Sequence, residues 1–206
     1  MFIPRHPVVE NQFCSYGSQT ATAAAGIGGV IAYAGSVVYL DETATNEESI
    51  VKKMAYSASA FTPFGFLMQK VKTGYHQVHP AGFYMPGDLG SSDVIAQPSY
   101  TGAGVINGTK AVPVGVAHLG IWDTVHYTCT GGTTPSLKMA PGISLYAAAD
   151  EGKVTNSTVE ADGTDSVGER ASTTVVARVV KGASTAKCSA NINNTTLYPI
   201  RIKLLI

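Results

Sequence analysis

Two groups of histidines offer the residue types that metal binding or acid–base catalysis requires. His76 and His79 have the H-x-x-H spacing that holds a metal ion when both lie on one face of a helix. Gly74, Pro80 and Gly82 surround this pair and oppose a helix there, and no carboxylate stands between the histidines. Because too few further ligands can be named, the sequence predicts no metal site. The two histidines are expected to face solvent or an interface.

The second group consists of His118, Asp123 and His126, the residue types of a catalytic base and its orienting acid. Asp123 and His126 stand three residues apart, which on a strand places them on opposite faces. A serine nucleophile would need a sharp turn such as G-x-S-x-G, and the sequence contains none. No catalytic residue is therefore predicted. A small hydrolase that uses one of these three residues stays open as an alternative. Loss of an activity when one of them is replaced by alanine would support it.

Two glycine-containing segments share features with nucleotide-binding motifs but lack the spacing. In residues 104–110, GVINGTK, the threonine precedes the lysine, whereas a phosphate loop needs Lys followed by Ser or Thr. Gly26, Gly28 and Gly29 lack the third glycine of the dinucleotide fingerprint. The sequence thus predicts no cofactor.

The composition favours a protein that works inside an assembly. Charged residues make up 14% of the chain, against about 25% in ordinary domains, and the net charge is zero. The 14 Lys and Arg form no basic run, which argues against a nucleic-acid partner. Cys14, Cys129 and Cys188 are odd in number and far apart, which argues against a disulfide framework or zinc site and favours a reducing compartment.

Residues 1–29 are predicted to form an extended, irregular N-terminal arm without a signal peptide, because Pro4 and Pro7 oppose a helix. No charge occurs from residue 11 to residue 40, and residues 21–40 are long enough to span a bilayer. These residues are mostly Ala, Gly, Thr and Ser without basic flanks, so a flexible arm leading into a buried strand is expected rather than a membrane span.

Residues 30–206 are predicted to form a single, mainly β domain, a small β-barrel or β-sandwich with one short helix. The helix is expected at 47–60, where Ile50, Met54 and Ala58 stand four apart. A long, turn-rich interaction loop is expected at 72–108. Alternation and β-branched residues predict strands at 30–40, 64–71, 111–119, 120–130, 143–147, 153–159, 173–180 and 199–206.

One region of the chain resembles a known family. Its motifs, in order, are PVGVA at 113–117, GIW at 120–122, PGISLY at 141–146, EGKV at 151–154 and SVGER at 166–170. This order resembles the small capsid decoration (cement) proteins of tailed bacteriophages, over roughly residues 110–180. The long segment 72–104 and the helix at 47–60 depart from that pattern.

The resemblance implies a non-enzymatic β-barrel protein that clamps the outside of a phage head and stabilises it. It implies the major capsid protein as a partner, a homotrimer or homodimer, and a place on the virion surface after synthesis in the host cytoplasm. The arm and the aromatic loop would touch the shell, and Trp122 would be a packing anchor of a core or an interface. The predicted interface residues are Phe2, Ile3, Phe13, Tyr75, Phe83, Tyr84, Tyr100 and Trp122.

Two non-enzymatic alternatives also stay open. The departures from the family pattern leave room for another head or tail component of the phage. A β-rich cell-surface or carbohydrate-binding module would need exposed aromatics and a calcium cluster, and the acids at 41–48 lack the alternating spacing of such a loop.

Overall fold

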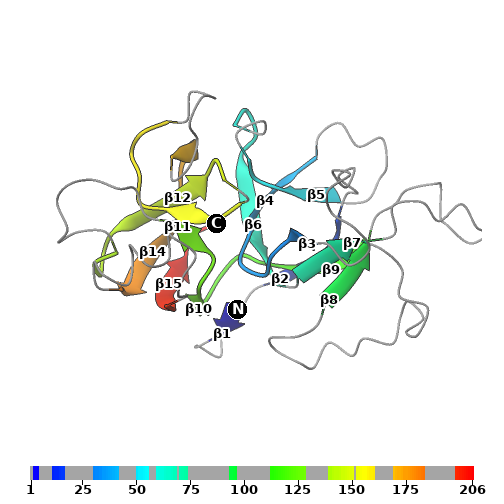
Figure 1. Cartoon of the computed structure of the whole chain (residues 1–206), viewed down its shortest axis with the longest axis horizontal. Helices are drawn as coiled ribbons and strands as arrows, with labels where there is room; N and C mark the ends of the chain where they lie inside the picture. The colour runs from blue at the N-terminus through cyan, green and yellow to red at the C-terminus, as the bar shows by residue number, and fades with distance from the viewer. Residues whose placement is uncertain are drawn as a thin grey trace, which may run out of the picture.

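A computed structural model describes the chain at residues 2–4, 11–16, 30–41, 50–55, 59–68, 70–73, 93–96, 112–128, 139–150, 152–160, 169–183 and 198–206. Within these ranges the protein is built from strands and turns, with no helix. A seven-stranded sheet lies beside a closed five-stranded barrel, and a small three-stranded sheet lies next to the barrel (Figure 1). The prediction of a mainly β protein containing a barrel is confirmed.

The seven-stranded sheet combines the two ends of the chain. Its order is β1 (Phe2–Pro4), β10 (Ile121–Thr124), β15 (Ile200–Leu204), β14 (Arg170–Lys181), β12 (Ser144–Ala148), β13 (Val154–Thr155) and β11 (Tyr127–Thr128). β14 and β15 are antiparallel, with Arg178 opposite Lys203 and Val179 opposite Ile202. β15 shows the alternation that the sequence predicts, because Ile200, Ile202 and Leu204 are buried on its inner face.

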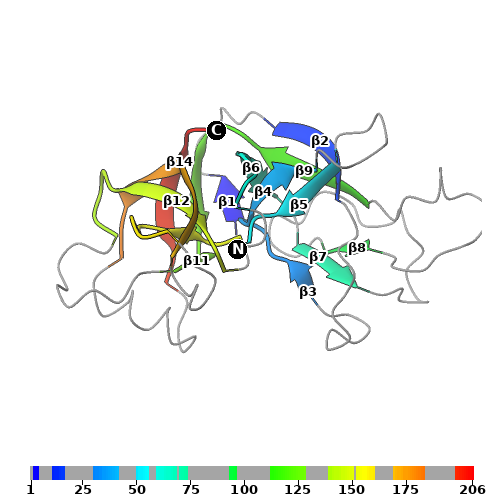
Figure 2. The same cartoon turned by 90° about the horizontal axis from the view of Figure 1, so that it is seen from above.

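The barrel closes through the middle of the chain. Its strands follow the order β2 (Asn11–Tyr16), β5 (Ile50–Lys53), β4 (Val37–Leu40), β6 (Pro63–Leu67) and β9 (Val112–Ala117), and β9 pairs back with β2. The small sheet has the order β3 (Val30–Ala32), β7 (Lys70–Thr73) and β8 (Asp93–Ala96). Figure 2 shows this sheet on one side of the barrel, away from β14 and β12.

One hydrophobic core joins the barrel to the seven-stranded sheet, because two barrel strands are buried on both faces. In β4, Val37 and Tyr39 face the core shared with the large sheet, whereas Val38 faces a second core within the barrel. In β6, Phe66 and Leu67 divide between the two cores in the same way. Since successive side chains of a strand point to opposite faces, these strands form a wall common to both parts.

Three turns between strands use glycine with a positive φ. Gly35 separates β3 from β4 with a φ of 93°, Gly142 precedes β12 with a φ of 90°, and Gly152 precedes β13 with a φ of 67°. These values lie in the left-handed region that favours glycine. The strands predicted around these turns are confirmed at β4, β12 and β13, and those farther along at β14 and β15.

Two predictions about the first third of the chain are wrong. Residues 2–4 and 11–16 were expected within an irregular arm, but they form strands β1 and β2. β1 pairs with β10 in the seven-stranded sheet, and β2 pairs with β9 in the barrel. Ile50–Lys53, expected within a helix, is strand β5 between β2 and β4. Here pairing on both edges outweighs the four-residue apolar spacing, which is a weak local preference. The expected interaction loop at 72–108 contains strand β8, and its other residues beyond Thr73 lie outside the described ranges.

Candidate functional site

The best-defined polar site lies at the junction between the barrel and the seven-stranded sheet. We use "junction" for Phe2, Gly35, Ser36, Thr124 and His126. The turn before β4 supplies Gly35 and Ser36, and the segment from the end of β10 towards β11 supplies Thr124 and His126. The turn is held by hydrogen bonds from the Gly35 N–H to the Leu67 carbonyl at 2.7 Å and from the Ser36 N–H to the Tyr33 carbonyl at 3.0 Å. These hydrogen bonds fix the turn in a conformation that places Ser36 next to the seven-stranded sheet.

Ser36 and His126 are hydrogen-bonded across the junction. The Ser36 Oγ lies 3.0 Å from the His126 Nε2 and also accepts a hydrogen bond from the Tyr33 N–H at 3.2 Å. The His126 N–H donates to the Thr124 Oγ1 at 3.0 Å. The Tyr33 ring packs against the imidazole with a centroid separation of 5.3 Å. Both the backbone and the ring of His126 are thus held in place.

A serine within hydrogen-bond distance of a histidine is the pairing that nucleophilic catalysis uses. Here Ser36 is 0% exposed and His126 is 8% exposed, so a substrate could not reach the hydroxyl without separating the two sheets. Buried polar groups that are paired in this way stabilise and orient the structure that contains them. The Ser36–His126 pair acts as a polar cross-link in the junction.

His118, Asp123 and His126, which a hydrolase would have to use, each engage a different partner. The Asp123 carboxylate accepts hydrogen bonds from the Arg201 guanidinium at 2.8 and 3.3 Å, and this contact raises the pKa of Arg201. The His118 ring packs edge-on against Phe64 with centroids 4.7 Å apart. His126 contacts Ser36. Although His118, Asp123 and His126 are close in sequence, these contacts do not join them in one site.

Phe2 and Trp122, two of the predicted interface residues, lie in the core. Their rings stack with centroids 4.3 Å apart and an interplanar angle of 6°, and Phe2 also stacks on Phe66 at 5.8 Å. Phe2 is 4% exposed and Trp122 is 1% exposed. The Trp122 indole N–H donates to the Leu119 carbonyl at 3.2 Å. Burial within the chain assigns both residues to packing between sheets, not to a surface that meets another protein.

The other predicted interface residues are placed less fully. Ile3 lies in β1 and Phe13 in β2, where each belongs to a paired strand. Tyr75, Phe83, Tyr84 and Tyr100 lie outside the described residues, as do His76 and His79.

Cysteine and metal chemistry have little support within the described ranges. Cys14 is a free, buried thiol in the barrel core, and burial raises its pKa, which disfavours the reactive thiolate. Cys129 and Cys188 lie outside those ranges. Among the residues described, no group of three or more His, Cys, Asp and Glu side chains could hold a metal ion. Nor does this part of the chain contain a helix with the length and hydropathy of a membrane span.

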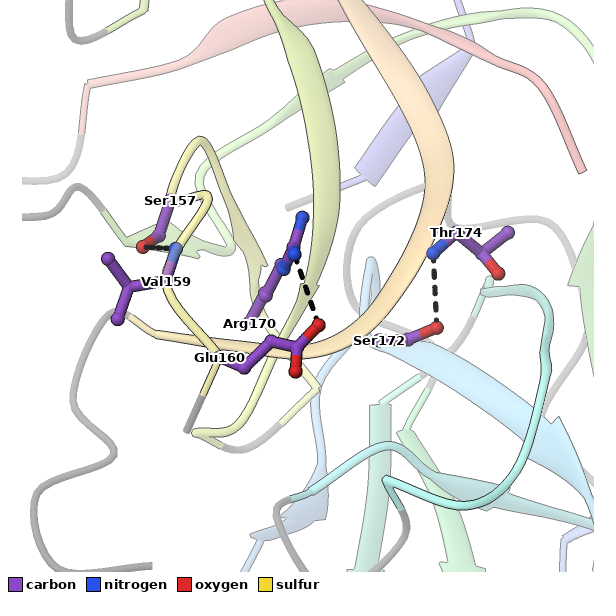
Figure 3. A network of polar contacts seen from close by, with 6 residues as sticks. All are labelled: Ser157, Val159, Glu160, Arg170, Ser172 and Thr174. Atoms are coloured by element: carbon purple, nitrogen blue, oxygen red, sulfur yellow. Dashed lines mark hydrogen bonds and ion pairs between the residues drawn. The ribbon is translucent and has the colours of Figure 1, made fainter. Parts of the chain in front are cut away.

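A second polar network fixes the start of β14 (Figure 3). The Arg170 guanidinium donates to the Glu160 carboxylate at 3.1 Å, and the Arg170 N–H donates to the Val159 carbonyl at 3.0 Å. The same guanidinium lies 5.2 Å from the centroid of the Tyr146 ring. Ser157 and Ser172 accept hydrogen bonds from the N–H groups two residues further along, at Val159 and Thr174. These contacts order the strand that leads to a basic surface.

The outward side of β14 and β15 is that basic surface, and the predicted sites did not include it. Its exposed cations are Arg178, Lys181 and Lys203, which we call the basic face. Arg178 lies directly opposite Lys203 in the register of the two strands. The signal was present in the sequence, because residues 170–206 hold six of the 14 Lys and Arg and none of the 14 Asp and Glu. Strand pairing was needed to show that the cations lie side by side.

Comparisons with known proteins do not assign this chain to a family. No protein-family model, no curated protein and no solved structure matches this chain.

Proposed function

We propose that this chain is a non-enzymatic virion structural protein, a decoration protein that binds the outside of a phage head and stabilises it. The observation that carries the proposal is the continuous core between barrel and sheet, in which Phe2, Phe66 and Trp122 stack across the junction. A clamp on a shell must transmit force between two contacts without deforming, and a close-packed interior resists deformation.

The segment that resembles decoration proteins adds support. PVGVA coincides with β9, GIW with the start of β10, and PGISLY with a tight turn followed by β12. These motifs therefore fall on a strand of the barrel, and on strands and a turn of the large sheet.

The chemistry of the junction also favours a structural role. Its one serine–histidine pair is buried and contacts Tyr33 and Thr124. The low charge of 14% suits a chain whose surface is covered by neighbours. Major capsid protein and further copies of this chain are the proposed partners, at the virion surface.

The test uses particles of the phage that encodes this chain, produced with and without its reading frame. Without the protein, we expect the particles to release packaged DNA at a lower temperature, measured with a DNA-binding dye. Adding the purified chain should restore the release temperature, and gold-labelled protein should decorate heads in electron micrographs.

Two results would contradict this role. Equal release temperatures with and without the chain would remove the stabilising function. Labelling confined to tails would exclude head decoration and would favour the alternative of a tail component.

A further inference from the structure

The site that holds β1 is formed by residues far from β1 in the sequence. We use "strand seat" for the residues that receive Phe2–Pro4, and these are Gly35, Phe66 and Trp122–Thr124. Among the described strands, β1 pairs with β10 alone, because it is the edge strand of the large sheet. On its other side β10 pairs with β15. The departure of β1 therefore breaks one strand pairing and leaves the rest of the sheet paired.

Phe2 anchors β1 in the strand seat. Its ring stacks on Trp122 at 4.3 Å and on Phe66 at 5.8 Å, and the residue is 4% exposed. Gly35 leaves room for this ring, because a Cβ at position 35 would lie 3.2 Å from it. Proteins that bind an extended peptide by strand addition use the same two elements, a sheet edge for the main chain and a pocket for a side chain. The strand seat thus has the features of a peptide-binding site.

The connection between β1 and β2 is short and passes from one sheet to the other. β1 belongs to the large sheet and β2 belongs to the barrel, so pairing between these two strands does not hold β1 in place. The six residues 5–10 join them, and this length of chain spans at most roughly 25 Å. His6 precedes Pro7, and a residue before proline prefers an extended backbone. Short connections of this kind favour the exchange of an element between identical copies.

Concentration decides whether the strand seat holds the strand of its own chain or that of another copy. Both strands make the same contacts, so the free energy of these contacts cancels in the comparison. A short flexible connection returns its own strand at an effective concentration on the order of millimolar. Copies held side by side on a shell, as the proposed function implies, reach a comparable local concentration.

We propose that β1 is an exchangeable strand and that, in assembled copies, Phe2–Pro4 of one chain occupy the strand seat of a second copy. The second copy then contributes the Phe2 ring to the core between Phe66 and Trp122, so each copy completes the junction of the other. The complementary surfaces are the ones that already fit together within one chain. This inference rests on the proposed structural role and names the element through which copies would associate.

Disulfide trapping between two different variants tests the exchange. Ile3 lies opposite Asp123 in the register of β1 and β10, and directly opposite residues on antiparallel strands have the Cα separation that a disulfide needs. Ile3→Cys and Asp123→Cys are made in separate full-length chains, each with Cys129→Ser/Cys188→Ser, and are mixed at protein concentrations up to about 1 mM in a glutathione redox buffer. Mass spectrometry should find a heterodimer joined between positions 3 and 123, with a yield that rises with protein concentration.

Two control variants separate exchange from random collision. Val159→Cys, at a position that is 57% exposed, takes the place of Asp123→Cys and should give at least about tenfold less heterodimer with Ile3→Cys. A single chain with Ile3→Cys/Asp123→Cys, oxidised when dilute, locks β1 in its own strand seat. This locked chain should stay monomeric in sedimentation equilibrium at about 1 mM, the concentration at which the wild type forms dimers.

Thermal melting of each variant establishes that it is folded, because Asp123→Cys removes the acceptor of the Arg201 guanidinium. Folded variants that give no more heterodimer than the Val159→Cys control overturn the proposal. If Asp123→Cys does not fold, sedimentation equilibrium of the wild type decides the question. Dimers near about 1 mM support the exchange, and a wild type that is monomeric at that concentration overturns it.

Failure of this inference is distinguishable from failure of the proposed function. A chain that gives no trapped heterodimer but still raises the DNA release temperature of particles would retain the decoration role and exclude strand exchange. Strand exchange in solution by a chain that leaves particles unchanged would retain the exchangeable strand and exclude decoration.

Discussion

Gly35 shows how individual residues hold the two sheets together. A Cβ at this position would lie 2.9 Å from the Thr124 Oγ1 and 3.2 Å from the Phe2 ring, both across the junction. Its φ of 93° adds a backbone requirement to this steric one. Gly142 has nearly the same φ, 90°, but nothing lies within 4 Å of its virtual Cβ. A comparison of Gly35 with Gly142 therefore separates the effect of close packing from the effect of backbone conformation.

We expect Gly35→Ala to destabilise the fold more than Gly142→Ala. The backbone term should cost each variant roughly 1–2 kcal/mol, since L-residues disfavour this region. The clash at the junction should cost Gly35→Ala roughly 1–3 kcal/mol more. Urea unfolding of the two variants measures the difference, and equal losses would contradict the close approach of the two sheets at Gly35.

Tyr127 makes stability sensitive to alkaline pH. Its hydroxyl donates to the Tyr198 carbonyl at 2.8 Å, and burial raises its pKa from 10.0 to about 12. Burial raises the pKa of Tyr16 as well. Since the folded state favours the neutral phenol of Tyr127, its contribution is complete below pH 10.0 and is lost as the pH rises through about 12.

We therefore expect the melting temperature to fall steeply between pH 10.0 and about 12, together with a rise in tyrosinate absorbance. Tyr127→Phe should cost about 1 kcal/mol near neutral pH through loss of its hydrogen bond, and should make the alkaline decline shallower. Replacing the exposed Tyr33 by Phe is the comparison. An unchanged alkaline decline in Tyr127→Phe would show that this phenol is not responsible.

At the scale of elements, β1 shows how the N-terminal end of the chain contributes to the fold. It pairs with β10, with Phe2 opposite Thr124 and Pro4 opposite Trp122. β1 is an edge strand of the large sheet, and Figure 2 shows it on the side of this sheet nearer the barrel. Three residues thus add an edge strand and deliver one aromatic ring to the shared core.

Removal of residues 1–4 should destabilise the protein, in contrast to what a dispensable arm would do. Loss of the Phe2 ring alone, in Phe2→Ala, should cost about 3–5 kcal/mol because it leaves a cavity between Phe66 and Trp122. Val159→Ala, at a position that is 57% exposed, should change the unfolding free energy by less than about 0.5 kcal/mol. Chemical denaturation that finds Phe2→Ala as stable as the wild type would contradict the packing.

At the scale of the whole molecule, barrel and large sheet share core residues and should unfold as one unit. Val37, Tyr39 and Phe66 of the barrel belong to the same buried cluster as Trp122, Ile202 and Leu204 of the large sheet. Elements that share one contiguous core lose stability together. The turn at Gly152 adds a backbone tie, because its carbonyl accepts a hydrogen bond from the Val37 N–H at 2.7 Å.

Two local probes can test this cooperativity. Trp122 is the single tryptophan, so its fluorescence reports on the junction, and Cys14 reports on the barrel interior. In a Cys129→Ser/Cys188→Ser background, thiol labelling of Cys14 and Trp122 fluorescence should give the same urea midpoint. Exposure of Cys14 at a clearly lower concentration would mean that the barrel unfolds separately.

How far local pattern predicts this fold is clearest in β15 and in the glycine turns. Ile200, Ile202 and Leu204 alternate with Arg201 and Lys203, and the same side chains are buried in the sheet. Glycines at positions 35, 142 and 152 occupy turns with a positive φ, which few other residues adopt. Both features depend on chemistry within a few residues, which a sequence displays directly.

Long-range pairing decided what local pattern could not. Nothing within residues 2–4 indicates that they pair with Trp122–Thr124, and nothing within Ile50–Lys53 outweighs its helical spacing until β2 and β4 flank it. The Ser36–His126 bond joins residues 90 positions apart, so spacing could not suggest it. For the basic face, the sequence by itself determined the surplus of cations after Glu169. Only the antiparallel register of β14 and β15 placed Arg178 opposite Lys203, because the side chains that face each other on a sheet are chosen by strand pairing across the whole molecule.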